Sequence, residues 1–212
     1  MIDDCNDPLA LVADLFCEEE MDLEAIEKSV RATLSAIGED PDRQGLQRTP
    51  QRVAKSYQEL LSGYRINPRE MINEAIFDVA YDEMVIVRDI EFSSMCEHHM
   101  LPILGRAHVA YVSSDKVIGL SKIPRIIDMF AKRLQVQERM TTQIAEFLEA
   151  VLNPKGVAVV VEGVHMCTML RGVKKQEARM TTSAMLGVFR DDMSTRMEFL
   201  DNISRGAQPL KF

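Results

Sequence analysis

The chain has 212 residues, of which 46% are hydrophobic and 27% are charged, so it is long enough for one well-buried globular unit with a smaller attached piece. Its formal net charge of -8 and pI of about 5.1 make the surface as a whole repel nucleic acid and anionic membranes, and neither is expected as a partner. Any anionic ligand must therefore be bound by a local basic pocket.

Residues 1–21 are acidic and lack hydrophobic periodicity, which predicts a loosely ordered leader. The chain starts Met1-Ile2-Asp3-Asp4, whereas a secretory signal needs basic residues there, and no apolar run approaches the roughly 20 residues that span a bilayer. A cytoplasmic protein is expected. In that reducing compartment Cys5 and Cys17 are expected to be free thiols.

The next region is predicted to be helical. Apolar side chains recur at helical spacing over residues 23–37 and stop at Gly38, which suits a helix C-cap. A second helix is predicted to begin at an N-cap, Thr49, and to carry an apolar stripe up to Gly63. A third, short helix is predicted after Pro68.

Strand and helix patterns alternate in the rest of the chain. The predicted segments are strands 84–92 and 106–112 joined through the Cys96 region, a turn at 113–115, an extended segment at 116–120, helices 124–134 and 140–151, strands 157–166 and 180–189, and a last helix with capping-box spacing from Thr195 to Glu198. The core order is β-β-α-α-β-β, an α+β arrangement in which a four-stranded antiparallel sheet carries its helices on one face. Its outer strands have no predicted partner, so association with copies of the same chain is expected.

Two short segments predict a metal site. In Cys96-Glu97-His98-His99 a cysteine and a histidine three residues apart can reach one metal ion from a single tight turn. In His165-Met166-Cys167, which follows a β-prone run, residues two apart on an extended strand would share a face and point into one pocket. Buried structural cysteine is the alternative for each motif alone. Together they favour a metal site, and thiolate and imidazole ligands favour zinc.

The two metal motifs and several other segments resemble the GTP cyclohydrolase I family. They are Asp40-Pro41-Asp42-Arg43-x-Gly45-Leu46 with Thr49-Pro50-x-Arg52-Val53-Ala54, Cys96-Glu97-His98-His99, Ile118-Gly119-Leu120-Ser121-Lys122-Ile123-Pro124-Arg125, Gln135-Val136-Gln137-Glu138-Arg139, and Gly163-Val164-His165-Met166-Cys167 followed by Arg171-Gly172-Val173-Lys174-Lys175. The resemblance covers about residues 22–206 in the order of the family, and only the leader departs from it.

The resemblance implies the tunnelling fold (T-fold), an α+β fold whose antiparallel sheet closes into a barrel by oligomerisation. It also implies a toroidal homodecamer of two pentameric rings with active sites at subunit interfaces. The implied organisation is the leader (1–21), an N-terminal helical region (22–75) and a catalytic T-fold domain (76–212).

The implied reaction converts GTP and water into formate and 7,8-dihydroneopterin triphosphate, which enters folate or tetrahydrobiopterin synthesis. Carried over residue by residue, Cys96, His99 and Cys167 would bind Zn²⁺ and leave a fourth position for water, which the metal would activate for attack on C8 of the purine. His98 and His165 would carry protons, because histidine exchanges them in both directions near neutral pH.

The family positions for substrate binding also map onto this sequence. Guanine presents adjacent donors at N1 and the exocyclic amine, so one carboxylate can accept from both. Glu138 occupies the base-recognition position of the family, and the resemblance implies that Gln137 beside it also binds the substrate. Without the resemblance, a solvated charge at a helix start would be the simpler interpretation of Glu138. The sequence contains no Gly-x-x-x-x-Gly-Lys loop, so side chains must bind the triphosphate. The implied set is Ser121, Lys122, Arg125 and Arg171, with Arg52 and Lys55, some of them from neighbouring subunits.

Two other functions stay open at this point. A non-catalytic zinc-binding scaffold of the same fold would close its metal with four protein ligands. A metal-free T-fold enzyme would use Cys96 or Cys167 as a nucleophile and would hold no stoichiometric zinc. His108, in mid-strand and outside every motif, is expected to be structural.

Overall fold

The computed structural model describes residue 16 and residues 19–205, so Cys5, Cys17 and most of the predicted leader lie outside the described residues. The elements are α2 (Leu23–Ala36), α3 (Thr49–Leu60), the 3-10 helix η2 (Ser62–Arg65), α4 (Pro68–Ile72), β1 (Ile76–Asp78), β2 (Met84–Cys96), β3 (Pro102–Val112), β4 (Lys116–Ile118), α5 (Lys122–Ala131), β5 (Leu134–Gln135), α6 (Gln137–Leu152), β6 (Gly156–His165), α7 (Met166–Met169), β7 (Met180–Gly187), α8 (Val188–Asp191) and α9 (Met193–Ser204). Within this part of the chain no helix has the length and apolar character needed to cross a bilayer. The order of the long elements confirms the predicted α+β core.

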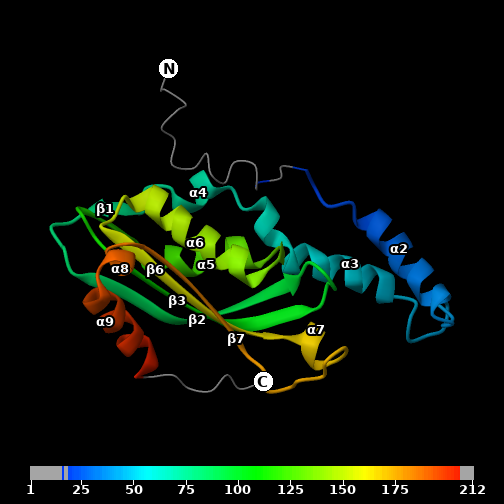
Figure 1. Cartoon of the computed structure of the whole chain (residues 1–212). Helices are drawn as coiled ribbons and strands as arrows, with labels where there is room; N and C mark the ends of the chain where they lie inside the picture. Colours follow the sequence, from blue (N-terminus) through cyan, green and yellow to red (C-terminus); the bar gives the residue numbers. More distant parts are fainter. Residues whose placement is uncertain (1–15, 17–18, 206–212) are drawn as a thin grey trace.

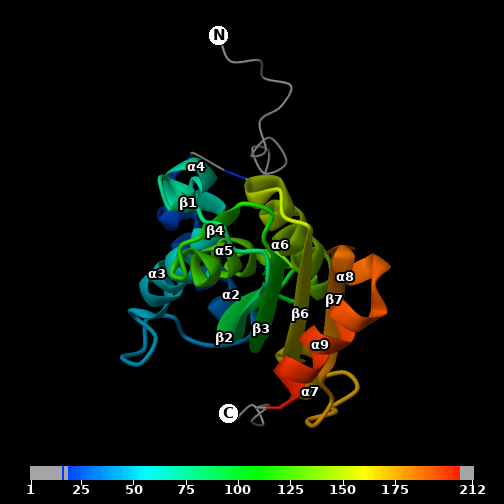
Figure 2. The ribbon, with the colours of Figure 1, turned by 90° about the vertical axis from the view of Figure 1, so that its left-hand side faces the viewer.

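A curled sheet with the strand order β5-β2-β3-β6-β7 forms the centre of the molecule (Figures 1 and 2). Strands β2, β3, β6 and β7 pair antiparallel, as predicted from the sequence. The prediction of four strands is corrected by β5, which adds a short parallel pairing at the end of β2.

The strand β5 arises where the sequence predicted helix. Residues 124–134 were expected to form one helix, but α5 ends at Ala131 and Leu134 pairs with Met95 of β2. The buried side chain of Arg133 stabilises the chain reversal, because its guanidinium donates to two backbone carbonyl oxygens, at 2.7 Å each. A tertiary contact therefore overrides the local helical pattern here.

The two faces of the sheet belong to separate cores. Val157, Val159 and Val161 of β6 lie in the larger core, which contains α5 and α6, whereas Ala158 and Val160 lie in the smaller core with residues of α8 and α9. The sequence predicted helices on one face only, but α9 covers the other face (Figure 2). Because both faces are covered, β6 is a continuous apolar run without alternation.

The N-terminal helices extend from one side of the sheet (Figure 1). Helix α2 packs mainly against α3 and has no buried residue. The predicted stop at Gly38 is confirmed, since this residue has a φ of +90° directly after the C-cap. Thr49 is the first residue of α3 and not its N-cap as predicted, and no side chain caps that helix.

Short elements account for the remaining corrections. Residues 116–118 form β4, which pairs with β1 in a separate two-stranded sheet. The last strand ends at Gly187, where a φ of +54° turns the chain into α8. The predicted capping box is wrong: α9 begins earlier, and Oδ2 of Asp192 accepts from the backbone N–H of Thr195 at 2.8 Å.

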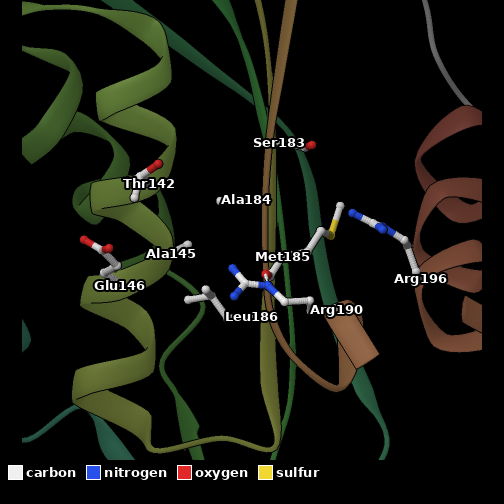
Figure 3. A pocket seen from close by; sticks show the side chains of 9 residues that line it. All are labelled: Thr142, Ala145, Glu146, Ser183, Ala184, Met185, Leu186, Arg190 and Arg196. Atoms are coloured by element: carbon white, nitrogen blue, oxygen red, sulfur yellow. Dashed lines mark hydrogen bonds between the residues drawn. The ribbon is translucent and has the colours of Figure 1, made fainter. Parts of the chain in front are cut away.

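The outer edge of β7 has no strand partner within residues 19–205. A hollow of about 320 Å³ lies beside it, lined by Thr142, Ala145 and Glu146 of α6, residues 183–186 of β7, and Arg190 and Arg196 (Figure 3). Arg190 is held in place, because its Nε donates to the carbonyl oxygen of Met185 at 3.0 Å. The edge therefore presents backbone N–H and C=O groups that pair with no other strand of residues 19–205.

Candidate metal centre and adjoining pocket

One end of the sheet brings together segments that are far apart in the sequence. Strand β2 ends at Cys96, and strand β6 ends at His165, which lies opposite Ile103 near the start of β3. On the other side of β2, Gln135 pairs with Cys96. The two predicted metal motifs are therefore neighbours because they end neighbouring parts of one sheet.

The side chains of Cys96, His99 and Cys167 meet at this end. Their possible ligand atoms all lie within 4.8 Å of one another. Zinc bound about 2.3 Å from sulfur and about 2.0 Å from nitrogen in a tetrahedral site holds its ligand atoms roughly 3.5 to 4 Å apart, so small movements suffice to bind it. Both cysteines are buried and His99 is exposed. The donor set fits zinc, and within the described chain this group has three members.

A tight turn after β2 directs Cys96 and His99 to the same point. The backbone N–H groups of His99 and Met100 donate to the carbonyl oxygen of Cys96, at 3.3 and 2.8 Å, and Met100 has a φ of +52°. The Sγ of Cys96 lies 3.8 Å from Nδ1 of His99 and 3.9 Å from Nδ1 of His98. His98 is otherwise exposed, with 66% of its side chain accessible.

Cys167 reaches the site by a different route from the one predicted. The strand ends at His165, and Cys167 lies in the short helix α7, so the argument from alternating strand positions is wrong. The hydroxyl of Thr168 donates to the carbonyl oxygen of His165 at 2.9 Å, which stabilises the change from strand to helix. The helical turn carries the thiol to Cys96 and His99, so the predicted grouping holds although the predicted geometry does not.

The thiol of Cys167 is affected by its surroundings, including the neighbouring Cys96. Burial raises the pKa of the Cys167 thiol, and the hydrogen bond and charge of Cys96 raise it further, while the positive charge of Arg171 lowers it. A bound cation would oppose the first two effects, because metal ligation requires the thiolate form. Without a metal the surroundings thus favour the protonated form of Cys167, and ligation would require its thiolate.

An ion pair ties the metal-binding turn to helix α6. The guanidinium of Arg139 donates to the carboxylate of Glu97, and its Nε donates to Oε1 of Gln135 at 3.0 Å. The hydrogen bond from Arg139 holds the pKa of Glu97 below its ordinary value. Arg139 was predicted only as part of a motif, without a role.

His165 is held by Gln137. The Nε2 of His165 lies 2.9 Å from Oε1 of Gln137, whose side chain is 1% exposed. Burial lowers the pKa of His165, and the negative charge of Glu138 raises it. Glu138 is therefore close enough to act on His165, and its carboxylate is exposed in the first turn of α6.

A cavity of about 280 Å³ opens beside His165. Its other lining residues are Thr168, Val173, Lys175, Ala178, Arg179 and Met180. Lys175 and Arg179 give this cavity local positive charge, although the formal net charge of the chain is -8. Arg179 lies outside every quoted motif, so sequence reasoning missed it.

The predicted triphosphate residues differ in their surroundings. Lys122 is buried, and its Nζ donates to the carbonyl oxygen of Met71 at 2.6 Å. The others are exposed: Ser121, Arg125, Arg171, Arg52 and Lys55. Arg171 lies near the metal trio, as its effect on Cys167 indicates, whereas Arg52 and Lys55 lie on α3.

His108 lies away from this end of the sheet, opposite Val160 in the middle of β3. It is 4% exposed, and its Nδ1 accepts from the backbone N–H of Asp89 at 3.2 Å. This placement agrees with the structural role expected for it.

Comparison with known proteins gives one consistent family. The model of a family described as GTP cyclohydrolase I matches residues 26–204. The chain is 55% identical over 185 residues to GTP cyclohydrolase 1 of Gloeobacter violaceus, with 87% of this chain and 86% of that protein covered. It is 56% identical over 178 residues to GTP cyclohydrolase 1 of Deinococcus radiodurans, covering 84% and 82%. The protein of the same name from Leptospira biflexa is 53% identical over 182 residues, covering 86% and 100%.

Proposed function

This chain belongs to the GTP cyclohydrolase I family, and on that premise we propose that it opens the imidazole ring of GTP by zinc-dependent hydrolysis, releasing formate and forming 7,8-dihydroneopterin triphosphate. The observation that carries the proposal is the meeting of Cys96, His99 and Cys167 within 4.8 Å, at the strand end that also carries His165. The location in the cytoplasm, expected from the sequence, stays a prediction.

Cys96, His99 and Cys167 would hold the zinc ion. Three protein ligands are typical of catalytic zinc sites, whereas structural sites are closed by four. When bound, the ion supplies Lewis acidity, which makes water a competent nucleophile near neutral pH. This ligand number favours the enzyme over the scaffold of the same fold.

His165 and His98 would manage the protons of ring opening. Breaking a bond between C8 and a ring nitrogen requires a proton on that nitrogen, and histidine can deliver it and recover one near neutral pH. His165 is half-buried and its position is fixed by a hydrogen bond, so it is suited to transfer protons directly to and from the purine ring. His98 is exposed and suits exchange with solvent.

Glu138 would read the guanine base. Its exposed carboxylate can accept from both N1–H and the exocyclic amine, a pair of donors that adenine lacks. Its electrostatic effect on His165 supports a position beside the reacting ring. Sites built on such hydrogen bonds can reject substrates that lack them by about 10⁴ to 10⁵.

The triphosphate would be bound by side chains, since its charge must be met locally on an acidic protein. Ser121, Arg125 and Arg171 are exposed and suited to this task. Arg52 and Lys55 of α3 would serve a site on a neighbouring subunit. Lys122 would bind the triphosphate once the substrate or a neighbouring copy draws its Nζ away from the carbonyl oxygen of Met71.

The active enzyme is proposed to be a homo-oligomer, with two pentameric rings as the family resemblance implies. The unpaired edge of β7 and the hollow beside it, with Arg190 and Arg196, support docking of another copy there (Figure 3). Light scattering tests this: an active, well-folded monomer would refute a shared site.

The deciding experiment measures zinc content and formate release from GTP on the same purified protein. One zinc per chain with GTP-dependent formate release is the expected result. Stoichiometric zinc without formate release would favour the scaffold. Formate release from zinc-free protein would favour a cysteine nucleophile and refute the proposal.

A further inference from the structure

We propose that Gln137 is a positioning residue that fixes His165 in a single tautomer, with the hydrogen on Nε2, so that His165 exchanges protons only through Nδ1. The inference deepens the proposed function, on which its kinetic tests rest. It also changes the role expected for Gln137 from the sequence, which was contact with the base.

The first step is the orientation of the Gln137 amide. Its Nε2 lies 3.1 Å from the carbonyl oxygens of Val161 and Met180 and 3.1 Å from Oγ1 of Thr182. Carbonyl oxygens only accept hydrogen bonds, so the atom that faces them must be the NH₂ group. A flipped amide would place its oxygen against two other oxygens. The hydrogen-bond network therefore assigns this side chain unambiguously.

The second step is the tautomer of His165. Because the amide nitrogen is engaged elsewhere, the atom 2.9 Å from Nε2 of His165 is Oε1 of Gln137, which can only accept. Nε2 must then donate, and it must carry a hydrogen in both the neutral and the charged ring. The neutral imidazole has its lone pair on Nδ1. Proton transfer can therefore use only one of the two ring nitrogens.

The third step is the rigidity of this contact. Gln137 is 1% exposed and begins α6, while its partners lie on β6 and β7. The hydroxyls of Thr141 and Thr182 lie 2.7 Å apart, and Thr141 also donates to the backbone oxygen of Gln137 at 2.7 Å. A Cβ at Gly163 would lie 2.4 Å from Oε1 of Gln137, so a larger residue there would displace the amide oxygen from its present position.

The fourth step concerns what Gln137 can still bind. Its two N–H hydrogens face three acceptors within the protein, and its oxygen is taken by His165. No N–H group of Gln137 is left to bind the guanine base, and the side chain is buried. Reading of guanine therefore falls to Glu138, its exposed neighbour.

A spectroscopic experiment tests the tautomer directly. The zinc-loaded protein is labelled with ¹⁵N in its histidine rings, and solid-state NMR distinguishes protonated from bare Nδ1 and Nε2. The chain has four histidines, so the spectrum of His165→Asn identifies the signal of His165. We expect hydrogen on Nε2 and a bare Nδ1 at high pH. Hydrogen on Nδ1 with a bare Nε2 would overturn the proposal, whatever the enzyme's activity.

A kinetic experiment tests the consequence with Gln137→Met, which keeps the length of the side chain but removes both hydrogen-bonding groups. Loss of the hydrogen-bonding partner of a metal-ligating histidine typically costs about 10- to 100-fold, and we take the same range for the partner of His165. We expect kcat for formate release to fall by that factor, while KM for GTP and zinc content stay within about twofold. An increase in KM with unchanged kcat would make Gln137 a base reader and refute the proposal.

A double-mutant cycle separates positioning from general damage. In the background of His165→Asn, Gln137→Met should cause no further loss of kcat, because residues that act through one another are not additive. A full additional 10- to 100-fold loss would overturn the proposal. If wild-type protein releases no formate, the proposed function fails, whereas the NMR result still decides the tautomer.

Discussion

Two histidines on paired strands, for which we propose different roles, lie in different environments. His165 ends β6 and His108 lies in the middle of β3, and burial lowers the pKa of both. Each has one ring nitrogen in a hydrogen bond with the protein. Each also lines a cavity, of about 280 Å³ at His165 and about 330 Å³ at His108.

The difference lies in the neighbours. His165 is two residues from Cys167, beside the candidate metal trio, and the negative charge of Glu138 acts on it. His108 lies among Asp89, Arg106 and Glu162, whose charges of both signs act on it. A buried histidine with a lowered pKa is therefore not by itself evidence of catalysis. The chemistry is indicated by the soft ligands beside it, which occur at the strand ends and not in mid-strand.

The largest expected effect comes from removing a ligand. Cys167→Ser should lose bound zinc and reduce formate release by more than about 10⁴-fold, beyond the usual range for a proton-transfer group, because serine is a poor zinc ligand. Metal analysis and a formate assay measure both. Cys17→Ser, the same change in the predicted leader, is the matched control and should alter neither. Zinc retained at full occupancy in Cys167→Ser would contradict the ligand assignment.

The next effect separates the two histidines. His165→Asn should lower kcat by about 10² to 10⁴, or roughly 3 to 5 kcal/mol of barrier, with zinc and GTP binding retained. His108→Asn should leave kcat within about twofold. Equal losses in both variants would erase the distinction, and loss of zinc in His165→Asn would make His165 a ligand.

A smaller effect tests the neighbour of His165. Glu138→Ala should raise KM for GTP by about 10²-fold or more, because two donors of guanine would lose their acceptor. Isothermal titration with GTP measures the binding directly. Glu149→Ala, which removes an exposed carboxylate from the same helix, should bind GTP normally. Normal GTP binding by Glu138→Ala would leave Glu138 as a solvated helix charge.

The smallest effect concerns stability and pH at His108. Burial lowers its pKa in the folded state against the charges of Asp89 and Glu162, which raise it, while Arg106 and Arg88 lower it. The unfolded chain then binds the proton more readily, so this residue makes the free energy of unfolding fall as pH drops below about 6.5. His108→Asn should lose less stability than wild type between pH 7.5 and 5.5. Melting temperatures measured across this pH range detect the difference, at about 2 to 4 °C per kcal/mol. The same pH dependence of the melting temperature in both proteins would argue against this role of His108.

The long elements and the metal trio could be predicted because their signals are local. Helical periodicity marks α6, a continuous β-prone run marks β6, and the Cys96 turn carries its own ligand spacing. The short elements could not. Leu134 joins β5 because of contacts made by Arg133, and Asp192 caps α9 three residues before the predicted capping box. Elements of two to four residues depend on partners elsewhere in the chain, so local pattern says little about them.

The sequence predicted which residues belong to the site better than it predicted how their side chains are arranged. The motif named Gln137 and Arg139 without indicating that one holds His165 and the other holds the metal-binding turn. Arg179 lies beside His165 only because the chain folds back between α7 and β7. Such roles depend on which side chains meet across the sheet, and a linear pattern does not contain that information.

The close approach at Gly163 has a consequence for sequence drift. A Cβ there would lie 2.4 Å from the amide oxygen of Gln137, so a larger residue at position 163 is compatible only with a shifted or shorter side chain at position 137. In a library that randomises both codons and selects for folded protein, larger residues at position 163 should therefore be recovered together with shorter side chains at position 137. Substitutions at the end of β6 are then coupled, because replacing Gly163 alone displaces the side chain that orients His165.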